Sequence, residues 1–249
     1  TEDAAARVGA DDDFFTLGGN SVIATQVAAR LGAALGVRVP VRLVFEASTV
    51  EALAARVESQ NGTARVALTP QVRPERIPLS LAQQRMWFLN RFDTDSSAYN
   101  ITIGVRLSGL LDRQSLQIAV ADVLNRHEVL RTRYPDVAGE PYQRVEQTAR
   151  VIPDLAPIEV DEQTLATDVT ALVQSAFDIS ERPPFRARLF EISPTEHVLV
   201  VVVHHIAADG FSMGPLARDI VTAYAARVDG GEPDWKPLPV QYIDYALWQ

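Results

Sequence analysis

One run of valines constrains the fold of this chain more than any other feature. Residues 198–203 are all apolar, and five of the six are valine. Because β-branched side chains favour the pleated surface of a sheet, the run predicts a strand buried on both faces. Two histidines, His204 and His205, follow at once, and then a short loop of small residues that ends in Asp209 and Gly210. The sequence therefore places two proton-carrying side chains at one end of a core strand.

The loop leads into a predicted helix. Ser212 can cap it, and Pro215 is tolerated because the first turn of a helix has N–H groups without intrahelical acceptors. Apolar residues then follow at helical spacing, namely Met213, Leu216, Ile220, Val221 and Tyr224. A helix N-terminus beside a histidine would bring backbone donors and a proton carrier into one small volume. On the residues alone, a catalytic site and a pair of structural histidines both remain open.

The histidine pair does not predict a metal site. Neighbouring residues on a strand point to opposite faces, so two adjacent imidazoles rarely reach one ion. The other histidines, His127 and His197, lie in different segments, and the chain has no cysteine. We therefore expect no bound metal.

A second candidate site lies near the N-terminus. Gly18 and Gly19 permit a tight backbone turn, and either Asn20 or Ser21 can cap the helix that follows. The packed side of this helix is expected to consist of Val22, Ile23, Val27, Leu31 and Leu35. A well-capped helix with no further role explains the segment as well as a functional serine does.

Composition divides the chain into two parts joined by a linker. Residues 1–58 end in a helix capped by Thr49, after a short apolar turn over residues 40–45. Residues 59–76 contain prolines and polar residues without helical periodicity, which predicts an interdomain linker. In the remaining part, residues 77–249, we expect helices over 79–89, from Asp112 onward and over 161–177. Strands are expected over 98–107, 128–134 and 185–189, with a hairpin turn at 135–139.

Charge and composition exclude several functional classes. The net charge of -9 argues against a nucleic-acid partner. No stretch approaches the ~18 consecutive apolar residues of a membrane span. The acidic N-terminus, residues 1–13, is unlike a signal peptide, and the absence of cysteine suits a reducing compartment. We therefore expect a cytoplasmic protein with no membrane partner.

Four motifs in the second part resemble those of condensation domains in nonribosomal peptide synthetases. Residues 204–210 match the HHxxxDG signature of that family. Residues 80–89, 126–132 and 242–248 are similar to its first, second and fourth motifs, in the family's order. The resemblance implies an α/β sandwich lobe of the chloramphenicol-acetyltransferase-like type, within an α+β multidomain chain.

The resemblance also implies a reaction and roles for the residues of the signature. Condensation domains form an amide bond between a donor acyl thioester and the amine of an acceptor held on a second carrier protein. His205 occupies the catalytic position of the family, and His204 is expected to act through packing. Asp209 resembles a residue that holds the loop through an ion pair, and the N–H of Gly210 would polarise the thioester oxygen.

The first part resembles a peptidyl carrier protein. Residues 12–21 are similar to the thiolation motif DxFFxxGGxS, whose serine carries 4'-phosphopantetheine, here on Ser21. Phe14, Phe15 and Leu17 are expected to anchor the loop before it. A phosphodiester at a helix N-terminus meets unpaired N–H groups and the positive end of the helix dipole. The implied partners are a phosphopantetheinyl transferase, an upstream adenylation domain and a downstream acceptor carrier.

The same resemblance predicts a fragment: a carrier, residues 1–58, whose N-terminal helix is largely missing, and the N-terminal lobe of a condensation domain. The C-terminal lobe would be missing, so we expect the isolated chain to be inactive. Two alternatives stay open, a carrier followed by an epimerisation domain and a non-catalytic platform that binds carriers. The donor and acceptor amino acids and the donor's stereochemistry are not readable from the residues.

Overall fold

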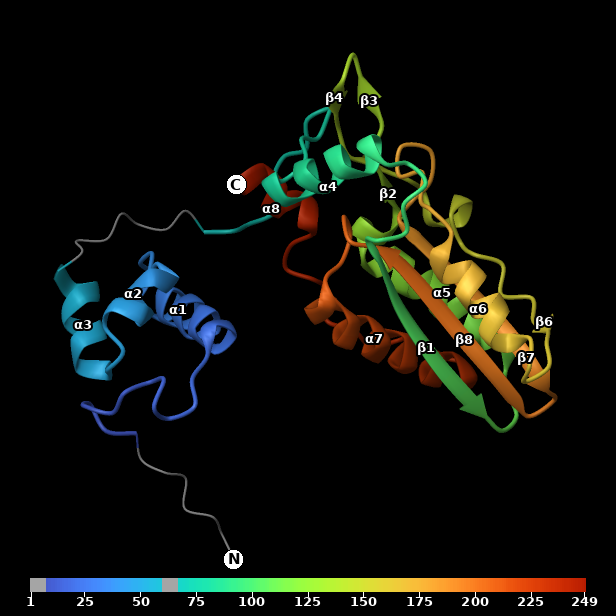
Figure 1. The fold of residues 1–249 in the computed structure, drawn as a ribbon, viewed down its shortest axis with the longest axis horizontal. Helices are drawn as coiled ribbons and strands as arrows, with labels where there is room; N and C mark the ends of the chain where they lie inside the picture. The colour runs from blue at the N-terminus through green and yellow to red at the C-terminus, as the bar shows by residue number, and fades with distance from the viewer. Residues whose placement is uncertain (1–7, 60–66) are drawn as a thin grey trace, which may run out of the picture. The chain divides into compact units, whose positions relative to one another are not determined.

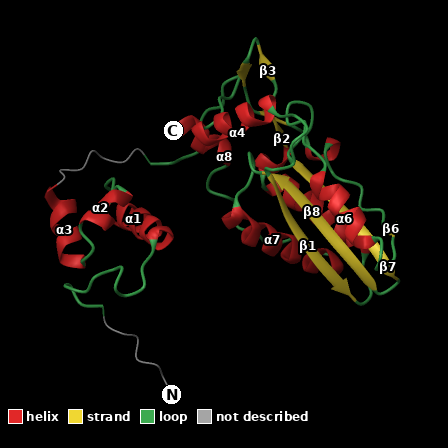
Figure 2. Ribbon diagram, in the orientation of Figure 1, coloured by secondary structure: helices red, strands yellow, loops and turns green. Residues whose placement is uncertain are grey.

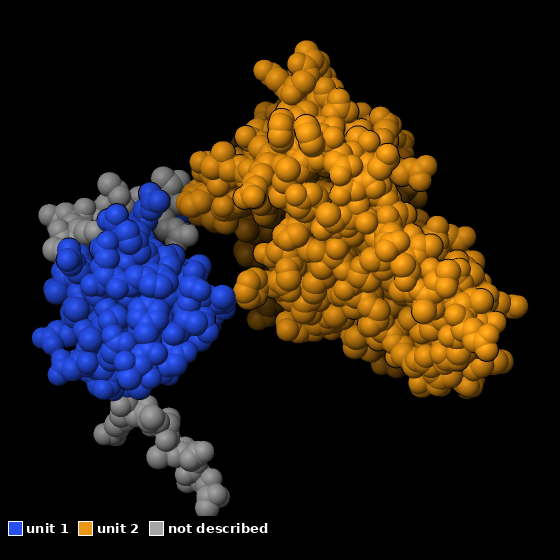
Figure 3. Space-filling model, in the orientation of Figure 1, with its two compact units in different colours: residues 1–67 blue, residues 68–249 orange. Residues whose placement is uncertain are grey.

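The chain divides into two compact units. The structure is a computed structural model that describes residues 8–59 and 67–249. The units comprise Thr1–Ala67 and Leu68–Gln249 (Figures 1 and 3). The second unit therefore begins earlier than the predicted boundary at residue 77. Residues 60–66 of the predicted linker lie outside the described residues, whereas the backbone N–H of Gln71 donates to Asp244 Oδ1 at 2.9 Å within the second unit.

The first unit is a small helical bundle. It contains α1 (Ser21–Leu35), α2 (Val41–Glu46) and α3 (Val50–Ser59). The backbone N–H of Ala52 donates to Thr49 Oγ1 at 3.2 Å, so the predicted cap of the third helix is confirmed. The expected turn over residues 40–45 is wrong, because most of it forms α2.

The packed face of α1 differs from the prediction. Ala24 and Ala28 are buried together with Gly32, whereas Val22 and Leu35 are 44% and 56% exposed. Small residues four positions apart let α1 approach α2 closely, so the larger side chains lie to either side of the contact. The core of this unit consists of Ala24, Ala28, Val39, Leu43, Val44, Ala47 and Leu53.

The second unit is built on one four-stranded sheet. The strand order is β1 (Asn100–Ser108), β8 (Glu196–His204), β7 (Phe185–Ser193), β6 (Ile158–Glu159). β8 is antiparallel to both neighbours, and β6 runs parallel to β7. The predicted valine strand is thus confirmed as a central strand, and it lies inside because both of its edges are paired (Figure 2).

Helices cover both faces of this sheet. Leu199, Val201 and Val203 pack with α5 (Arg113–Arg126) and α7 (Gly210–Val228) in one core cluster. Val200 and Val202 belong to a second cluster that includes residues of α4 (Leu81–Phe92) and α6 (Leu165–Gln174). Alternate side chains of β8 therefore supply two separate cores, which is why the run is apolar without alternation.

The remaining elements are short and surround the end of the sheet where β8 terminates. They are the 3-10 turns Glu128–Arg131 and Thr148–Arg150, the strands β2 (Thr132–Arg133), β3 (Asp136–Val137), β4 (Glu140–Pro141) and β5 (Arg144–Val145), and the helix α8 (Tyr242–Trp248). The strand expected over residues 128–134 is therefore mostly a 3-10 turn, and the helix expected over 161–177 is shorter. Among the described residues, no helix has the length and apolar character needed to cross a membrane.

Candidate functional site

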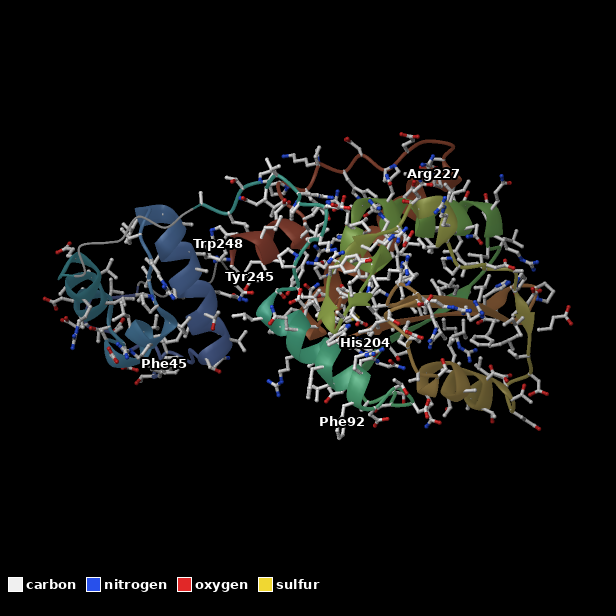
Figure 4. All side chains as sticks on the ribbon, turned by 90° about the horizontal axis from the view of Figure 1, so that it is seen from above. Phe45, Phe92, His204, Arg227, Tyr245 and Trp248 are labelled. Carbon is white, nitrogen blue, oxygen red and sulfur yellow. The ribbon has the colours of Figure 1, made fainter. Side chains whose placement is uncertain are left out.

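The two adjacent histidines lie in different environments. His204, labelled in Figure 4, is the last residue of β8 and is 1% exposed. Its ring is in edge contact with the ring of Phe177 at a centroid distance of 6.0 Å. His205 is exposed, and its backbone N–H donates to the carbonyl oxygen of Tyr99 at 2.8 Å. The side chains diverge as expected for neighbours at a strand end. Only His205 can meet a substrate from solvent.

His204 is held neutral by its surroundings. Burial, followed by the nearby charges of His205 and Arg186, lowers the pKa of the His204 imidazole to about 4. Its Nδ1 accepts a hydrogen bond from the backbone N–H of Ile206 at 3.1 Å, which requires an unprotonated nitrogen. This bond closes the turn after β8, so His204 sets the direction in which the chain presents His205.

Asp209 caps the helix that follows the loop. Its Oδ1 accepts hydrogen bonds from the backbone N–H of Ser212 at 2.9 Å and from the Ser212 hydroxyl at 2.6 Å. The expectation that Ser212 is the cap is wrong, because α7 begins at Gly210 and Ser212 is the third residue of its capping box. These hydrogen bonds are the main cause that lowers the pKa of the Asp209 carboxyl, with His205 a minor one. Asp209 is thus a carboxylate at neutral pH.

Gly210 opens α7 and leaves its backbone accessible. Its N–H belongs to the first turn, where no intrahelical acceptor exists. A Cβ built on Gly210 would meet no atom of the described chain within 4 Å, so the residue is exposed and unobstructed. The loop therefore presents an imidazole, a carboxylate and a helix N-terminus, which together can move a proton and stabilise an oxyanion.

The other motifs converge on the same end of the sheet. Tyr242 of α8 shares a hydrogen bond of 3.0 Å with Ser80, the N-cap of α4. Gln241 accepts from the backbone N–H of Glu128 and donates to the carbonyl oxygen of Arg126. Segments more than a hundred residues apart in the chain are thereby fixed beside the start of α7.

The Arg126 motif has a structural role in these contacts. Arg126 Nε and His127 Nε2 both lie near Asp219 Oδ2 of α7, at 3.0 and 2.6 Å. Arg126 also lies over the ring of Trp235, 4.8 Å from its centroid. The motif therefore ties α5 to α7, and its side chains serve packing in the described part of the chain.

An apolar pocket of about 550 Å³ adjoins the histidine loop. Ala207 and Ala208 line it from the loop, Met213 from α7 and Tyr245 from α8. The ring of Tyr245 contacts those of Tyr242 and Trp248 in tilted arrangements, at centroid distances of 5.4 and 6.0 Å. Tyr245 and Trp248 are labelled in Figure 4. The pocket gives an apolar substituent a place close to His205.

Two residues around His204 were not anticipated from the sequence. Arg186 of β7 lies over Phe177, with 3.8 Å from its Cζ to the ring centroid, and donates to the backbone carbonyls of Ser175 and Ala176. The sequence predicts Phe177 at the end of a helix over residues 161–177 and Arg186 on a strand over residues 185–189. No local signal links them to His204, because Arg186 reaches it only when β7 pairs with β8. Phe177 lies before β7, and Asn90 Nδ2 of α4 donates to its carbonyl oxygen at 3.0 Å.

The first unit presents Ser21 at the start of α1. Asn20 is the N-cap, and its Oδ1 accepts from the backbone N–H groups of Val22 and Ile23 at 3.0 and 3.1 Å. Ser21 is exposed, so its hydroxyl is open to a modifying enzyme. The site fits a phosphodiester, because an anion there faces the positive end of the helix dipole.

Tight packing explains the glycines before Ser21. A Cβ on Gly19 would lie 2.4 Å from the ring of Phe14, and Gly18 has φ +92. The backbone N–H of Phe14 donates to the carbonyl oxygen of Ser48 at 2.8 Å, which anchors the loop to the bundle. Leu17 is 57% exposed, so its expected anchoring role is wrong. Of the three residues expected to anchor this turn, Phe14 and Phe15 remain.

Comparisons with known proteins identify the family of each part of the chain. A family model described as a condensation domain matches residues 74–249, and one described as a phosphopantetheine attachment site matches residues 1–57. A dimodular nonribosomal peptide synthase of Bacillus subtilis is 46% identical over 98% of this chain and 10% of its own length. The chain thus spans a small part of this relative.

Solved structures of the same kind share the fold. The X-domain in its complex with OxyB from teicoplanin biosynthesis is 40% identical, with a TM-score of 0.70 over 74% of this chain and 40% of that one. The starter condensation domain of the rhizomide synthetase RzmA has a TM-score of 0.61 at 22% identity, over 70% and 43%. The predicted fold class is confirmed, and the chain belongs to the condensation domain family, with a phosphopantetheine attachment domain preceding it.

Proposed function

We propose that this chain works in nonribosomal peptide synthesis, with Ser21 as the point of tethering and His205 as the catalytic residue of amide formation. The observation that carries the proposal is the exposed His205 beside the N-terminus of α7, within a condensation domain that follows a carrier. The attached 4'-phosphopantetheine would supply a thiol that carries the acyl group as a thioester.

The residues of the loop divide the chemistry between them. The amine nitrogen of the acceptor forms a bond to the acyl carbon, the carbon–sulfur bond breaks, and the thiol leaves with a proton. His205 takes the proton from the amine and passes it to the leaving sulfur, a contribution of typically ~10²–10⁴-fold. The N–H of Gly210 donates to the oxygen on which negative charge develops. The carboxylate of Asp209 accepts the hydrogen bonds of Ser212 and keeps the start of α7 in place.

Holding the two reactants together contributes more than the proton transfer. Alignment of tethered reactants can lower a barrier by ~7–11 kcal/mol. The partners required are a phosphopantetheinyl transferase for Ser21, an adenylation domain that provides the acyl group and an acceptor carrier. The apolar pocket beside Met213 would receive an apolar substituent of one reactant.

A full-length synthetase that contains this chain provides the test. Ser21→Ala is expected to abolish addition of the arm from coenzyme A, measured by mass spectrometry. Thr25→Ala, a hydroxyl loss on the same helix, should leave it unchanged. His205→Ala should keep loading intact and lower peptide formation by ~10²–10⁴-fold, the size of a general-base contribution. A folded His205→Ala enzyme with undiminished turnover would overturn the catalytic assignment.

The isolated 249-residue chain is expected to form no amide. His205 is open to solvent in the described structure, so water is not excluded from the place where the reactants must meet. Mixing the loaded chain with an aminoacyl carrier and following the product by mass spectrometry tests this expectation. Turnover equal to that of the full-length enzyme would contradict it.

A partner-binding platform is the second candidate. The X-domain that matches at 40% identity was solved in complex with OxyB, so a related domain does bind another protein. If this chain were only a platform, His205→Ala would leave peptide formation unchanged. The same experiment therefore separates the two functions.

A further inference from the structure

A second pocket of about 550 Å³ lies beside β7 and shares no lining residue with the apolar pocket at the histidine loop. Arginines dominate its lining: Arg133, Arg150, Arg182, Arg186 and Arg188. Two glutamates, Glu146 and Glu181, are the acidic residues of the lining. Such a concentration of positive charge is unexpected in a chain with a net charge of -9.

Most of this charge is not neutralised by the protein. Arg133 Nε lies 2.5 Å from Glu146 Oε1, and Glu146 is also approached by Arg144 at 3.4 Å. Within residues 8–59 and 67–249, the other four arginines of the lining have no carboxylate oxygen within ion-pair distance. Glu146 already pairs with two guanidinium groups. The positive charge of the other four arginines is therefore available to an anion from solution.

The fold holds one of these arginines, Arg186, in place. Arg186 is half-buried and is fixed by its hydrogen bonds to the carbonyls of Ser175 and Ala176 and by its position over Phe177. At Arg182 the structure fixes the backbone, whose N–H donates to the carbonyl oxygen of Asp178 at 3.0 Å, and the side chain is exposed. Preorganised cations lose less side-chain entropy when a ligand binds.

The cations are close enough to repel one another. After burial, which is the largest cause, Arg182 and Arg188 lower the pKa of the Arg186 guanidinium. Arginine nevertheless stays protonated in proteins, so the repulsion persists at neutral pH. A bound anion would relieve it, because the interaction of charges in a partly buried site is weakly screened.

We propose that this pocket binds a small molecule that carries a diphosphate group. Guanidinium groups bind phosphate oxygens through paired, charge-assisted hydrogen bonds, and two neighbouring phosphates match several guanidinium groups better than one does. Val151, Pro153 and Phe185 supply an apolar wall for an organic substituent. The volume lies within the range of small-molecule sites, ~300–1,000 Å³. The site is separate from the chemistry proposed for His205.

Calorimetric titration of the 249-residue chain tests the proposal, with pyrophosphate, ADP and inorganic phosphate as probes and without divalent cations. Pyrophosphate is expected to bind saturably and more tightly than phosphate, with an affinity that falls as salt rises. Equal affinity for ADP would identify the diphosphate as the whole ligand. Tighter binding of ADP would show that the apolar wall seats the organic part.

Variants assign the binding to the pocket. Arg182→Gln combined with Arg188→Gln should weaken pyrophosphate binding by about tenfold or more, tenfold being roughly 1.4 kcal/mol. Both side chains are exposed, so folding should persist. The matched control, Arg85→Gln combined with Arg218→Gln, removes the same charge from exposed arginines outside the pocket.

Three results would overturn the proposal. The first is the absence of saturable binding at millimolar pyrophosphate. The second is an equal loss of affinity in the control variant, which would assign binding to overall charge. The third is binding of a poly-glutamate peptide without binding of pyrophosphate, which would assign the arginines to a protein partner.

Discussion

Burial of His204 predicts that the second unit loses stability in mild acid. The folded chain holds the His204 pKa at about 4, whereas an unfolded histidine titrates near ~6.5. Between these values the unfolded state binds the proton and the folded state does not. The stabilisation from the neutral imidazole is therefore fully present above about pH 6.5 and is lost as the pH falls toward 4.

The structure sets the size of this effect. The difference between a pKa of about 4 in the folded chain and ~6.5 in the unfolded chain corresponds to roughly 3 kcal/mol of folding free energy, at ~1.4 kcal/mol per pH unit. Because His204 is 1% exposed, solvent screening hardly reduces that figure. Acidification from about pH 7.5 to about pH 5 covers most of the window and should lower the free energy of unfolding by about 2 kcal/mol through this residue.

Urea unfolding at a series of pH values measures the loss. The three tryptophans, Trp87, Trp235 and Trp248, all belong to the second unit, so their fluorescence reports its unfolding without the first unit. In His204→Asn the amide oxygen can accept the N–H of Ile206, but the side chain does not titrate. The variant should therefore lose about 2 kcal/mol less than the parent between about pH 7.5 and about pH 5.

The comparison of two chains removes other acid effects. Carboxylates that protonate in the same range contribute to parent and variant alike, so they cancel in the difference. His205→Asn should reduce the loss only in part, because it removes one cause of the low His204 pKa and leaves burial, the largest cause, in place. Equal losses of stability in parent and His204→Asn would refute the account of His204 as a neutral, buried acceptor.

Three further predictions concern the packing of the two sites. Gly19→Ala forces a Cβ against the ring of Phe14 and should destabilise the first unit by about 1–3 kcal/mol, the cost of overpacking, seen as faster amide hydrogen exchange in residues 8–59. Asp209→Asn keeps a good N-cap and should leave stability within roughly 0.5 kcal/mol, yet it removes the carboxylate and should slow peptide formation; unchanged turnover would limit Asp209 to capping. Tyr242→Phe loses the hydrogen bond to the N-cap of α4 and should cost about 0.5–1.5 kcal/mol in urea unfolding, whereas no loss would mean that water replaces that bond.

Local chemistry was sufficient for much of the fold. The valine run, the cap of α3 at Thr49 and the start of α5 after Asp112 follow from residues close together in the chain, and the structure confirms all three. The opposite orientation of His204 and His205 also follows from the period of a strand. The family resemblance, which the comparisons confirm, rests on four short motifs in order.

Errors arose where packing decided between local options. Both Asp209 and Ser212 are good caps, and the hydrogen bonds between them, with Asp209 as the acceptor of the backbone N–H, decide where α7 begins. Val22 and Leu35 fit a helical stripe, yet α1 packs through its alanines because α2 approaches closely there. Periodicity counts apolar residues and contains no information on how near a neighbouring helix comes.

The surroundings of the histidines depended on tertiary structure alone. Arg186 reaches His204 because β7 pairs with β8 in a particular register, and strand register is a property of two segments. Phe177 lies before β7, where Asn90 of α4 donates to its carbonyl oxygen at 3.0 Å. Tyr242 reaches Ser80 across 162 positions of the chain. The pKa of His204 and the basic pocket beside β7 follow from the same long-range contacts, since burial and the spacing of charges exist only after the sheet has formed.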